Sequence, residues 1–294
     1  SKEHLIYKRL KILLIRFSSI GDIVLTFPVV NAIRKSFPEA KIHFASKKSF
    51  ETLLLGADGI DQFHFLSDSF SAFKNEVKKE KFDYIIDLHK NFRTYKIQKA
   101  LGVPVLSYKK LSFQKFLLTK LHLNLMPSRH IADRSLDALA SLGVVSDGKG
   151  LDYFIPQEEE TKQSDLPHSH YLGYVGLVIG AAHSTNRWPT EQLKKLCSFL
   201  HHPIILLGGP EDRATGDEIA AIDPVKIYNA CGKFSINESA DLVRKAKLII
   251  THDTGLMHIA AVLHKPIISV WGNTVPAFGM TPYYGNKQVR NVQF

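Results

Sequence analysis

Residues 248–261 read Leu-Ile-Ile-Thr-His-Asp-Thr-Gly-Leu-Met-His-Ile-Ala-Ala, an apolar run that meets Asp-Thr-Gly and then continues as a second apolar segment. This pattern is typical of a buried strand that feeds a helix. It places Asp253, Thr254 and Gly255 at the start of the helix, where unpaired N–H groups and a partial positive charge suit a phosphate or diphosphate. His258 follows about one turn later and leans back toward that end. The alternative is a capped turn with a histidine in the core.

A second turn of this kind is expected near the start of the chain. Residues 11–16 read as a buried parallel strand, and the loop Phe-Ser-Ser-Ile-Gly-Asp follows at residues 17–22. Gly21 gives the backbone freedom to turn, and Asp22 then lies at the carboxyl end of a strand, where open α/β sheets bind ligands. Asp22 is equally suited to cap the helix expected over residues 23–35. The loop lacks the Gly-x-Gly-x-x-Gly fingerprint of dinucleotide sites.

Strands and helices alternate along the chain, which predicts parallel sheets covered on both faces. At 294 residues the chain is long enough for two domains. We expect domains over residues 1–155 and 169–294, joined by a polar, proline-flanked linker at 156–168. The expected strands lie near residues 11–16, 41–45, 61–65, 83–87, 104–107, 171–178, 203–207, 226–228, 248–251 and 266–270. The expected helices include residues 112–121, 130–142, 190–200, 211–221, 236–246 and 255–263.

The composition is that of an ordinary globular protein, with 45% hydrophobic and 22% charged residues. No apolar run approaches the ~20 residues that span a bilayer, and no signal peptide is recognisable. The two cysteines, Cys197 and Cys231, cannot build a disulfide framework, so we expect a cytoplasmic protein. Cys197 falls in an amphipathic helix pattern and is expected in the core.

The positive charge is confined to the first half of the chain. Residues 1–155 contain 25 Lys and Arg against 15 Asp and Glu, whereas residues 156–294 contain 13 of each. One domain is therefore expected to face an anionic surface. Two stretches carry the excess: Lys90, Arg93, Lys96 and Lys99 recur at helical spacing, and Lys109, Lys110, Lys115 and Lys120 alternate with apolar residues. The second stretch suits either a membrane surface or the ordinary outer face of a helix.

The two turn motifs together resemble the ADP-heptose:lipopolysaccharide heptosyltransferases, glycosyltransferase family 9. Further segments are similar to the family in its own order. These are residues 87–94 (Asp-Leu-His-Lys-Asn-Phe-Arg-Thr), 130–134 (His-Ile-Ala-Asp-Arg) with 142–143 (Leu-Gly), 187–189 (Arg-Trp-Pro), 207–210 (Leu-Gly-Gly-Pro) and 270–274 (Val-Trp-Gly-Asn-Thr). The resemblance implies a GT-B-like architecture, in which two Rossmann-like parallel-sheet domains face a central cleft. It also implies that the first domain binds the acceptor and the second binds the nucleotide-sugar donor.

The activity implied by the resemblance is an inverting transfer of heptose from ADP-heptose to a sugar hydroxyl of the lipopolysaccharide inner core. Asp22 is then the general base. The donor-binding candidates are Thr185, Arg187, Glu211, Asp212, Asp253, Thr254, Gly255 and His258. The acceptor-binding candidates are Ser19, Gly21, His89, Lys90, Arg93, His130 and Arg134. For each acceptor candidate a solvated surface role is the alternative, and for Glu211 and Asp212 a helix cap.

The partners and location follow from the same resemblance and from the charge. We expect a nucleotide-sugar donor, a lipid-linked anionic saccharide acceptor and an anionic membrane surface, with the protein peripheral at the inner face of the inner membrane. We expect no cofactor and no nucleic acid. The chain contains no Asp-x-Asp pair, so no metal site is expected and metal-independent transfer is predicted.

Two departures from the family pattern stand out. Asn186 occupies the position where relatives often carry a lysine before Arg-Trp-Pro. The chain also ends at Phe294, soon after Trp-Gly-Asn-Thr, and we expect the native protein to continue.

The alternatives to the predicted function come from other classes of protein. A GT-B-like nucleotide-sugar epimerase, or a glycosyltransferase with another donor, would share the architecture. A basic nucleic-acid-binding protein would share the charge, but it needs a recognition module that the sequence lacks.

Overall fold

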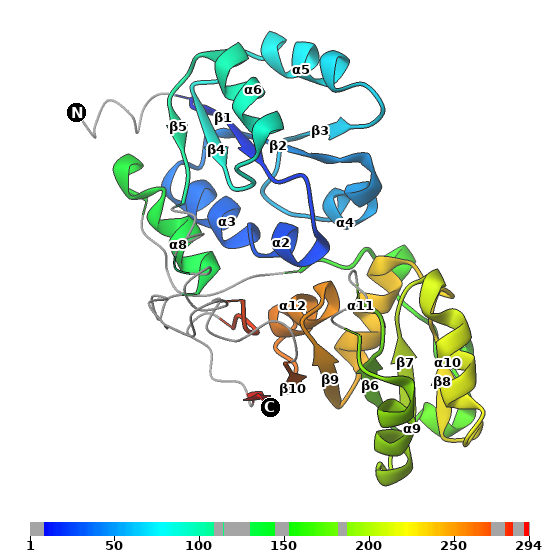
Figure 1. Ribbon diagram of the computed structural model, residues 1–294. Helices are drawn as coiled ribbons and strands as arrows, with labels where there is room; N and C mark the ends of the chain where they lie inside the picture. The colour runs from blue at the N-terminus through cyan, green and yellow to red at the C-terminus, as the bar shows by residue number, and fades with distance from the viewer. Residues whose placement is uncertain are drawn as a thin grey trace. The chain divides into compact units, whose positions relative to one another are not determined.

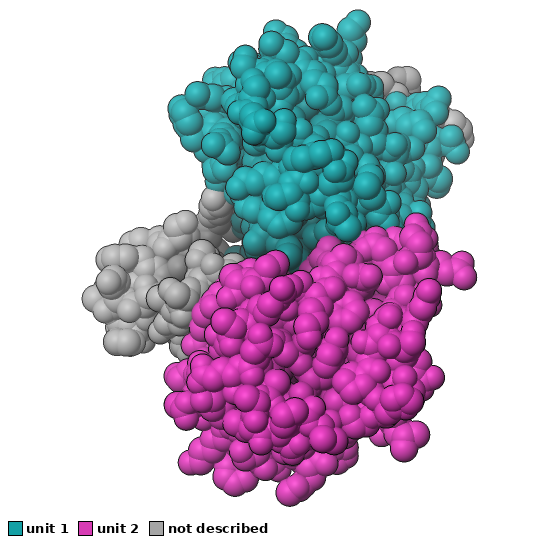
Figure 2. Space-filling model, turned by 90° about the vertical axis from the view of Figure 1, so that its right-hand side faces the viewer, with its two compact units in different colours: residues 1–151, 277–279 teal, residues 152–276, 280–294 magenta. Residues whose placement is uncertain are grey.

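The computed structural model describes residues 9–108, 114, 130–144, 153–181, 187–271, 280–284 and 291–293. The chain forms two compact units. One comprises residues 1–151 with 277–279, and the other residues 152–276 with 280–294 (Figure 2). The division falls four residues before the predicted end of the first domain, and the predicted linker at 156–168 belongs to the second unit.

The first unit is built on a five-stranded parallel sheet with the strand order β3-β2-β1-β4-β5. Its strands are β1 (Lys11–Ile15), β2 (Lys41–Lys47), β3 (Gln62–Leu66), β4 (Tyr84–Asp87) and β5 (Val105–Leu106). Its helices are α2 (Ile20–Val24), α3 (Phe27–Ser36), α4 (Glu51–Leu55), α5 (Phe70–Lys79), α6 (Phe92–Leu101) and α8 (Ile131–Asp137), with 3-10 turns η1 (Lys48–Phe50) and η2 (Ala140–Leu142).

Burial on both faces explains why the central strands read as continuous apolar runs. Leu13 and Ile15 of β1 pack with Phe73 of α5 and Ile97 of α6, so these helices cover one face of the sheet. Helices α2, α3 and α8 lie on the other face (Figure 1). The carboxyl ends of β1 and β4 are neighbours, because Ile15 pairs with Asp87.

The second unit has a six-stranded parallel sheet with the order β11-β10-β9-β6-β7-β8. Its strands are β6 (Val175–Val178), β7 (Ile204–Leu207), β8 (Ile227–Asn229), β9 (Leu248–His252), β10 (Ile267–Val270) and β11 (Asn291–Gln293). Its helices are α9 (Thr190–Phe199), α10 (Arg213–Ala220), α11 (Ile236–Lys245) and α12 (Gly255–Val262), with 3-10 turns η3 (Gln157–Glu159), η4 (Gln163–Asp165), η5 (His168–His170) and η7 (Pro210–Asp212).

Two hydrophobic clusters cover the two faces of this sheet. On one face, Leu242 of α11 and Ala260 of α12 pack on Leu207 and Ile249. The other face holds Cys197 of α9 among its strand neighbours, which confirms that this cysteine is a core residue. Two parallel α/β sheets, one in each unit, confirm the predicted fold class.

The segment predicted as a linker is anchored to α11. Glu159 accepts hydrogen bonds from Ser235 Oγ at 2.7 Å and Asn237 Nδ2 at 2.9 Å. Asp241, fully buried, accepts from the Thr161 amide and hydroxyl, both at 2.7 Å. Burial alone would raise the pKa of Asp241, but Lys245 and the Thr161 hydrogen bonds lower it below its ordinary value. The carboxylate is therefore charged in the folded state and fixes residues 156–168 to the second unit.

Within the described part of the chain, no helix has the length and apolar character that crossing a bilayer requires.

Candidate active site

The loop after β1 holds Asp22 through hydrogen bonds and an ion pair. One carboxylate oxygen accepts from the Ser19 amide at 3.1 Å and the Ser19 hydroxyl at 2.9 Å. The other lies 2.8 Å from the guanidinium of Arg16. Arg16 also donates to the carbonyl oxygens of Ser18 and Leu88, so it joins the ends of β1 and β4. Asp22 therefore has a fixed orientation at the carboxyl edge of the sheet.

The electrostatics of this loop keep Asp22 ionised. Burial opposes the charge, yet Arg16 and the two Ser19 hydrogen bonds lower the pKa of the Asp22 carboxyl below its ordinary value. The side chain of Asp22 is 20% exposed, so solvent reaches it. Asp22 occupies the third position of α2 and closes a capping box with Ser19. Asp22 is therefore not the N-cap of a helix over residues 23–35, because α2 begins at Ile20 and Ser19 is its N-cap. From the third helical position the carboxylate accepts from the Ser19 amide, and it remains accessible to solvent.

A buried carboxylate shapes the turn after β4. Asp87 is 1% exposed and accepts from the amides of His89 at 2.9 Å and Lys90 at 2.8 Å, and from Gln98 Nε2 at 2.6 Å. Lys90 adopts a left-handed backbone conformation with φ of 53°, and its ammonium donates to the Tyr108 carbonyl at 2.9 Å. These bonds turn the chain back so that α6 starts at the carboxyl edge. Asp87 was not predicted to have this role, although a carboxylate directly after an apolar strand is a signal for such a turn.

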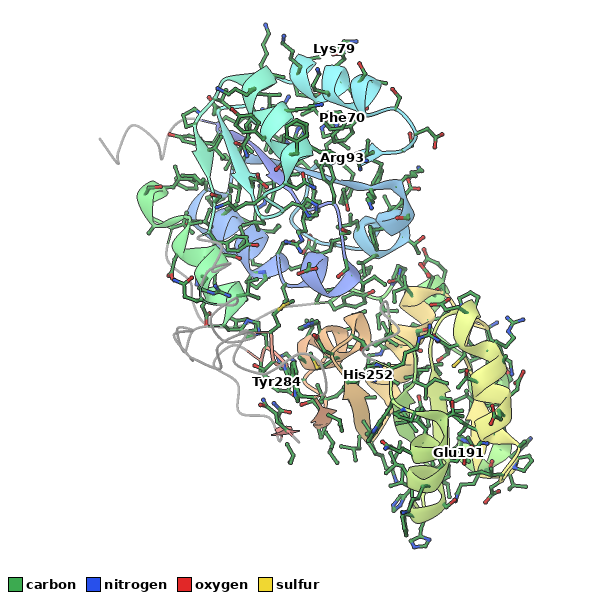
Figure 3. All side chains as sticks on the ribbon, in the orientation of Figure 1. Phe70, Lys79, Arg93, Glu191, His252 and Tyr284 are labelled. Atoms are coloured by element: carbon green, nitrogen blue, oxygen red, sulfur yellow. The ribbon has the colours of Figure 1, made fainter. Side chains whose placement is uncertain are left out.

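A pocket of about 330 Å³ opens at this edge of the first unit. It is lined by Phe17, Ser18, Lys47, His89, Asn91, Phe92 and Arg93. Arg93 projects from the first turn of α6 (Figure 3). The lining contains two cationic side chains and no carboxylate, so it suits an anionic or polyhydroxylated group.

The structure brings some of the predicted acceptor residues together and not others. His89 and Arg93 line the pocket, and the His89 ring lies edge-on to Phe17 at 5.4 Å between centroids. Ser19 is the N-cap of the adjoining helix α2, Gly21 lies in the first turn of that helix, and Lys90 is turned toward Tyr108. Lys47 was missed from the sequence because β2 was expected to end at residue 45.

His130 and Arg134 lie on α8 and do not line this pocket. His130 caps the helix, its Nδ1 accepting from the Ala132 amide at 3.1 Å. Burial lowers the pKa of the Arg134 guanidinium, and its buried Nε forms no hydrogen bond to the described residues.

In the second unit, β9 leads into α12 as the sequence predicted. Thr254 caps the helix, its hydroxyl accepting from the Met257 amide at 3.2 Å. Gly255 is the first helical residue, and His258 is buried with its Nε2 3.9 Å from the Asp253 carboxylate. The capped turn with a buried histidine is therefore observed, and it presents a helix N-terminus at the carboxyl edge of the second sheet.

A second carboxylate lies at the end of β7. Asp212 is 2% exposed, accepts from the Gly209 amide at 2.9 Å and pairs with Arg187 at 3.0 Å. A Cβ atom on Gly180 would lie 2.2 Å from the Asp212 carboxylate, so this glycine makes room for the ion pair. Glu211 is exposed to solvent, whereas Thr185 and Asn186 lie outside the described residues.

His252, the last residue of β9, is a buried histidine next to Asp253 that was not among the residues predicted from the sequence (Figure 3). Burial lowers its pKa to about 4, the Gly180 backbone opposes this, and the charge of Arg187 reinforces it. His252 is therefore neutral at physiological pH. The signal available in the sequence was its place between the buried strand and Asp253.

Metal-binding chemistry has no candidate cluster among the described residues, because no group of three or more His, Cys, Asp or Glu side chains is arranged to hold an ion.

The comparisons with known proteins agree with these features. The profile of glycosyltransferase family 9 (heptosyltransferase) matches residues 70–293. Lipooligosaccharide heptosyltransferase 2 of Haemophilus influenzae is 32% identical over 142 residues, which are 45% of this chain and 40% of that protein. The aligned part of the chain thus spans 40% of the length of that relative.

Two solved structures extend the likeness over the fold. The glycosyl transferase family 9 protein from Veillonella parvula has a TM-score of 0.78 at 25% identity, covering 98% of this chain and 86% of that one. The Escherichia coli heptosyltransferase WaaC, solved with ADP, has a TM-score of 0.73 at 20% identity, covering 97% and 93%. Because the family profile extends over more than half of its residues, this chain belongs to glycosyltransferase family 9, the heptosyltransferase family.

Proposed function

We propose that this protein is an inverting glycosyltransferase that moves a heptose from ADP-heptose to a sugar hydroxyl of the lipopolysaccharide inner core. The observation that carries the proposal is the ionised, partly exposed Asp22, held by Arg16 at the carboxyl edge of the first sheet in a member of family 9. Relatives named as heptosyltransferases, and one solved with ADP, support the choice of donor.

In the proposed reaction the acceptor hydroxyl attacks the anomeric carbon of the donor. Its oxygen forms the new C–O bond, the bond between that carbon and the diphosphate oxygen breaks, and ADP leaves with the electron pair. Asp22 takes the hydroxyl proton as general base. Arg16 keeps the carboxylate oriented, and its charge keeps Asp22 ionised before the proton arrives.

The second unit is proposed to hold the donor. The N-terminus of α12, at Thr254 and Gly255, offers backbone N–H groups and a partial positive charge to the diphosphate. Asp253 and His258 are assigned to the sugar, because a carboxylate would repel phosphate. Arg187 and Thr185 are assigned to the leaving diphosphate, with Arg187 kept in place by Asp212. Glu211 is assigned to the ribose hydroxyls.

The first unit is proposed to hold the acceptor in the pocket at the carboxyl edge. Lys47, Arg93 and His89 suit an anionic saccharide, since arginine binds carboxylates and phosphates with two hydrogen bonds. Ser19, Gly21 and Lys90 remain candidates near it, and His130 and Arg134 remain acceptor candidates at α8, away from the pocket lining. We propose that the reaction needs no metal and that the protein is cytoplasmic and peripheral at the inner face of the inner membrane.

Measurement of ADP release from ADP-heptose, with and without a deacylated inner-core acceptor, tests the function. We expect release that depends on the acceptor and persists after chelation of divalent ions and iron. Transient ADP with no glycosylated product would indicate the epimerase instead. A preference for UDP or GDP over ADP in thermal-shift experiments would indicate another donor, since a bound ligand raises apparent stability.

A further inference from the structure

We propose that the exposed face of α6, formed by Phe92, Tyr95, Lys96 and Lys99, docks the first unit on an anionic lipid bilayer. The proposed function enters only through the acceptor: a lipid-linked acceptor gives the protein a reason to bind at a bilayer. The four residues stand three, four and seven positions apart, so they share one face of the helix. The opposite face is buried through Thr94 and Ile97.

The aromatic side chains on this face are largely exposed to solvent. Phe92 is 71% exposed and Tyr95 is 51% exposed, although each belongs to a helix that packs well on its other side. The Lys96 ammonium lies 4.6 Å from the centroid of Phe92, and the Lys99 ammonium lies 5.6 Å from that of Tyr95. An aromatic ring beside a lysine suits a bilayer surface, since the ring enters the interface and the ammonium reaches the lipid phosphates.

The stretch of sequence that contains α6 carries an excess of positive charge, which points to an acidic partner. Nine Lys and Arg lie between Asp87 and Asp133, and this interval contains no Asp or Glu. Some other lysines of the described chain do pair with carboxylates, as Lys48 does with Glu51 and Lys194 does with Glu191. Among the described residues, no carboxylate forms an ion pair with Lys96 or Lys99. The face therefore complements a negative surface without first breaking an ion pair.

The same helix connects this face to the pocket. Phe92 and Arg93 in the first turn of α6 line the pocket, and Phe92 also belongs to the docking face. Docking through α6 would therefore hold the pocket at the lipid surface, where the saccharide of a lipid-linked acceptor lies.

The test compares two triple variants of the full chain by sedimentation with vesicles. Tyr95→Ala/Lys96→Glu/Lys99→Glu alters the face and spares the pocket. Leu55→Ala/Lys78→Glu/Lys79→Glu is the control, because it makes the same change in net charge in the same unit and removes an apolar side chain that is 62% exposed. The vesicles contain phosphatidylcholine alone or with phosphatidylglycerol. Thermal melting checks that both variants fold.

A lysine near an acidic bilayer strengthens partitioning about fivefold. We therefore expect the α6 variant to partition at least about tenfold more weakly into the acidic vesicles, with the control close to wild type and little binding to neutral vesicles. Wild-type binding by the α6 variant, or an equal loss in the control, would overturn the proposal. So would a concentration-dependent oligomer that the α6 variant abolishes while vesicle binding persists, since the face would then bind a second copy.

A second readout separates this proposal from the proposed function. With a deacylated acceptor in solution, the α6 variant should release ADP at the wild-type rate, and with acceptor embedded in acidic vesicles it should be slower. If the wild type releases no ADP with either acceptor, the proposed function fails, and vesicle binding still decides the role of α6.

Discussion

The guanidinium of Arg16 lies 2.8 Å from the Asp22 carboxylate and also holds the carbonyl oxygens of Ser18 and Leu88. One side chain thus fixes the candidate base, the loop that carries it and the end of the neighbouring strand. This relationship makes the ionisation of Asp22 depend on a residue that need not touch substrate.

Replacing Arg16 should move the pH dependence of the reaction. Arg16 lowers the pKa of Asp22, so in Arg16→Gln that pKa rises and the carboxylate is protonated at a higher pH. We expect the acid limb of the kcat/KM profile to shift to higher pH, with turnover about tenfold lower at neutral pH as orientation is lost. Arg34→Gln, which removes the partner of Asp61 at 2.7 Å, is the control and should leave the limb in place. An unshifted limb in Arg16→Gln would contradict the assignment.

The ion pair between Arg187 and Asp212 predicts a donor-side effect. In Arg187→Gln the diphosphate loses a positive charge, and we expect ADP to bind about tenfold more weakly in calorimetry. Arg213→Gln removes a nearby arginine whose guanidinium donates to the Gly232 carbonyl, and it should bind ADP as the wild type does. Equal affinity in all three proteins would place the diphosphate elsewhere.

The sequence predicted most of the fold because most strands are apolar runs that end at polar turns. β9 and its helix follow the prediction closely. The strand expected at 171–178 begins only at Val175, because the chain turns at Gly173 with φ of 121° and leaves Leu172 92% exposed. β11 was not predicted, since three residues with two polar side chains carry no strand signal. The predicted helix at 112–121 lies almost wholly outside the described residues, and so do the lysines of the second basic stretch at 109, 110, 115 and 120.

The site was predicted less completely, because its contacts join residues far apart in sequence. Asp22 was identified from its place after a strand, but the ion pair with Arg16 depends on how the loop folds back. Lys47 and His89 meet only because β2 and β4 flank β1 in the sheet. A pattern within a short stretch of sequence does not predict which distant residues become neighbours.

Acid should weaken the first unit through His43. This histidine is 3% exposed, with its Nδ1 2.9 Å from His64 Nε2, and burial lowers its pKa to about 4. In the unfolded chain this histidine has its ordinary pKa of about 6.5. Between pH 4 and pH 6.5 the unfolded state therefore holds more protons than the folded state, and stability rises with pH. The contribution is complete above about pH 6.5 and is lost as pH falls toward 4, about 3 kcal/mol in total.

Urea unfolding at pH 5 and pH 7.5 measures this effect. We expect the difference in unfolding free energy between the two pH values to be clearly smaller in His43→Gln than in the wild type. His168→Gln, on the η5 turn of the second unit, is the control and should keep the wild-type difference. If His43→Gln shows the same difference as the wild type, other groups cause the loss of stability at low pH.

The anchor of residues 156–168 predicts a stability effect in the second unit. Asp241→Ala removes the acceptor of two Thr161 hydrogen bonds and leaves the Thr161 amide buried without it. We expect a loss of about 2–3 kcal/mol in unfolding free energy and faster proteolysis within residues 156–168. Asp223→Ala, whose carboxylate pairs with Lys226 at 3.8 Å and is 43% exposed, should cost less than about 1 kcal/mol. Equal effects of the two changes would refute the anchor.

The most direct test of the account is the turnover of Asp22→Asn with donor and deacylated acceptor. Asparagine keeps the size of the side chain but cannot take the hydroxyl proton, so we predict turnover at least about a hundredfold lower with ADP affinity unchanged. Asp61→Asn, another carboxylate paired with an arginine in the first unit, controls for the loss of an ion pair. A folded Asp22→Asn protein that turns over within a few fold of wild type would contradict the role of Asp22 as base.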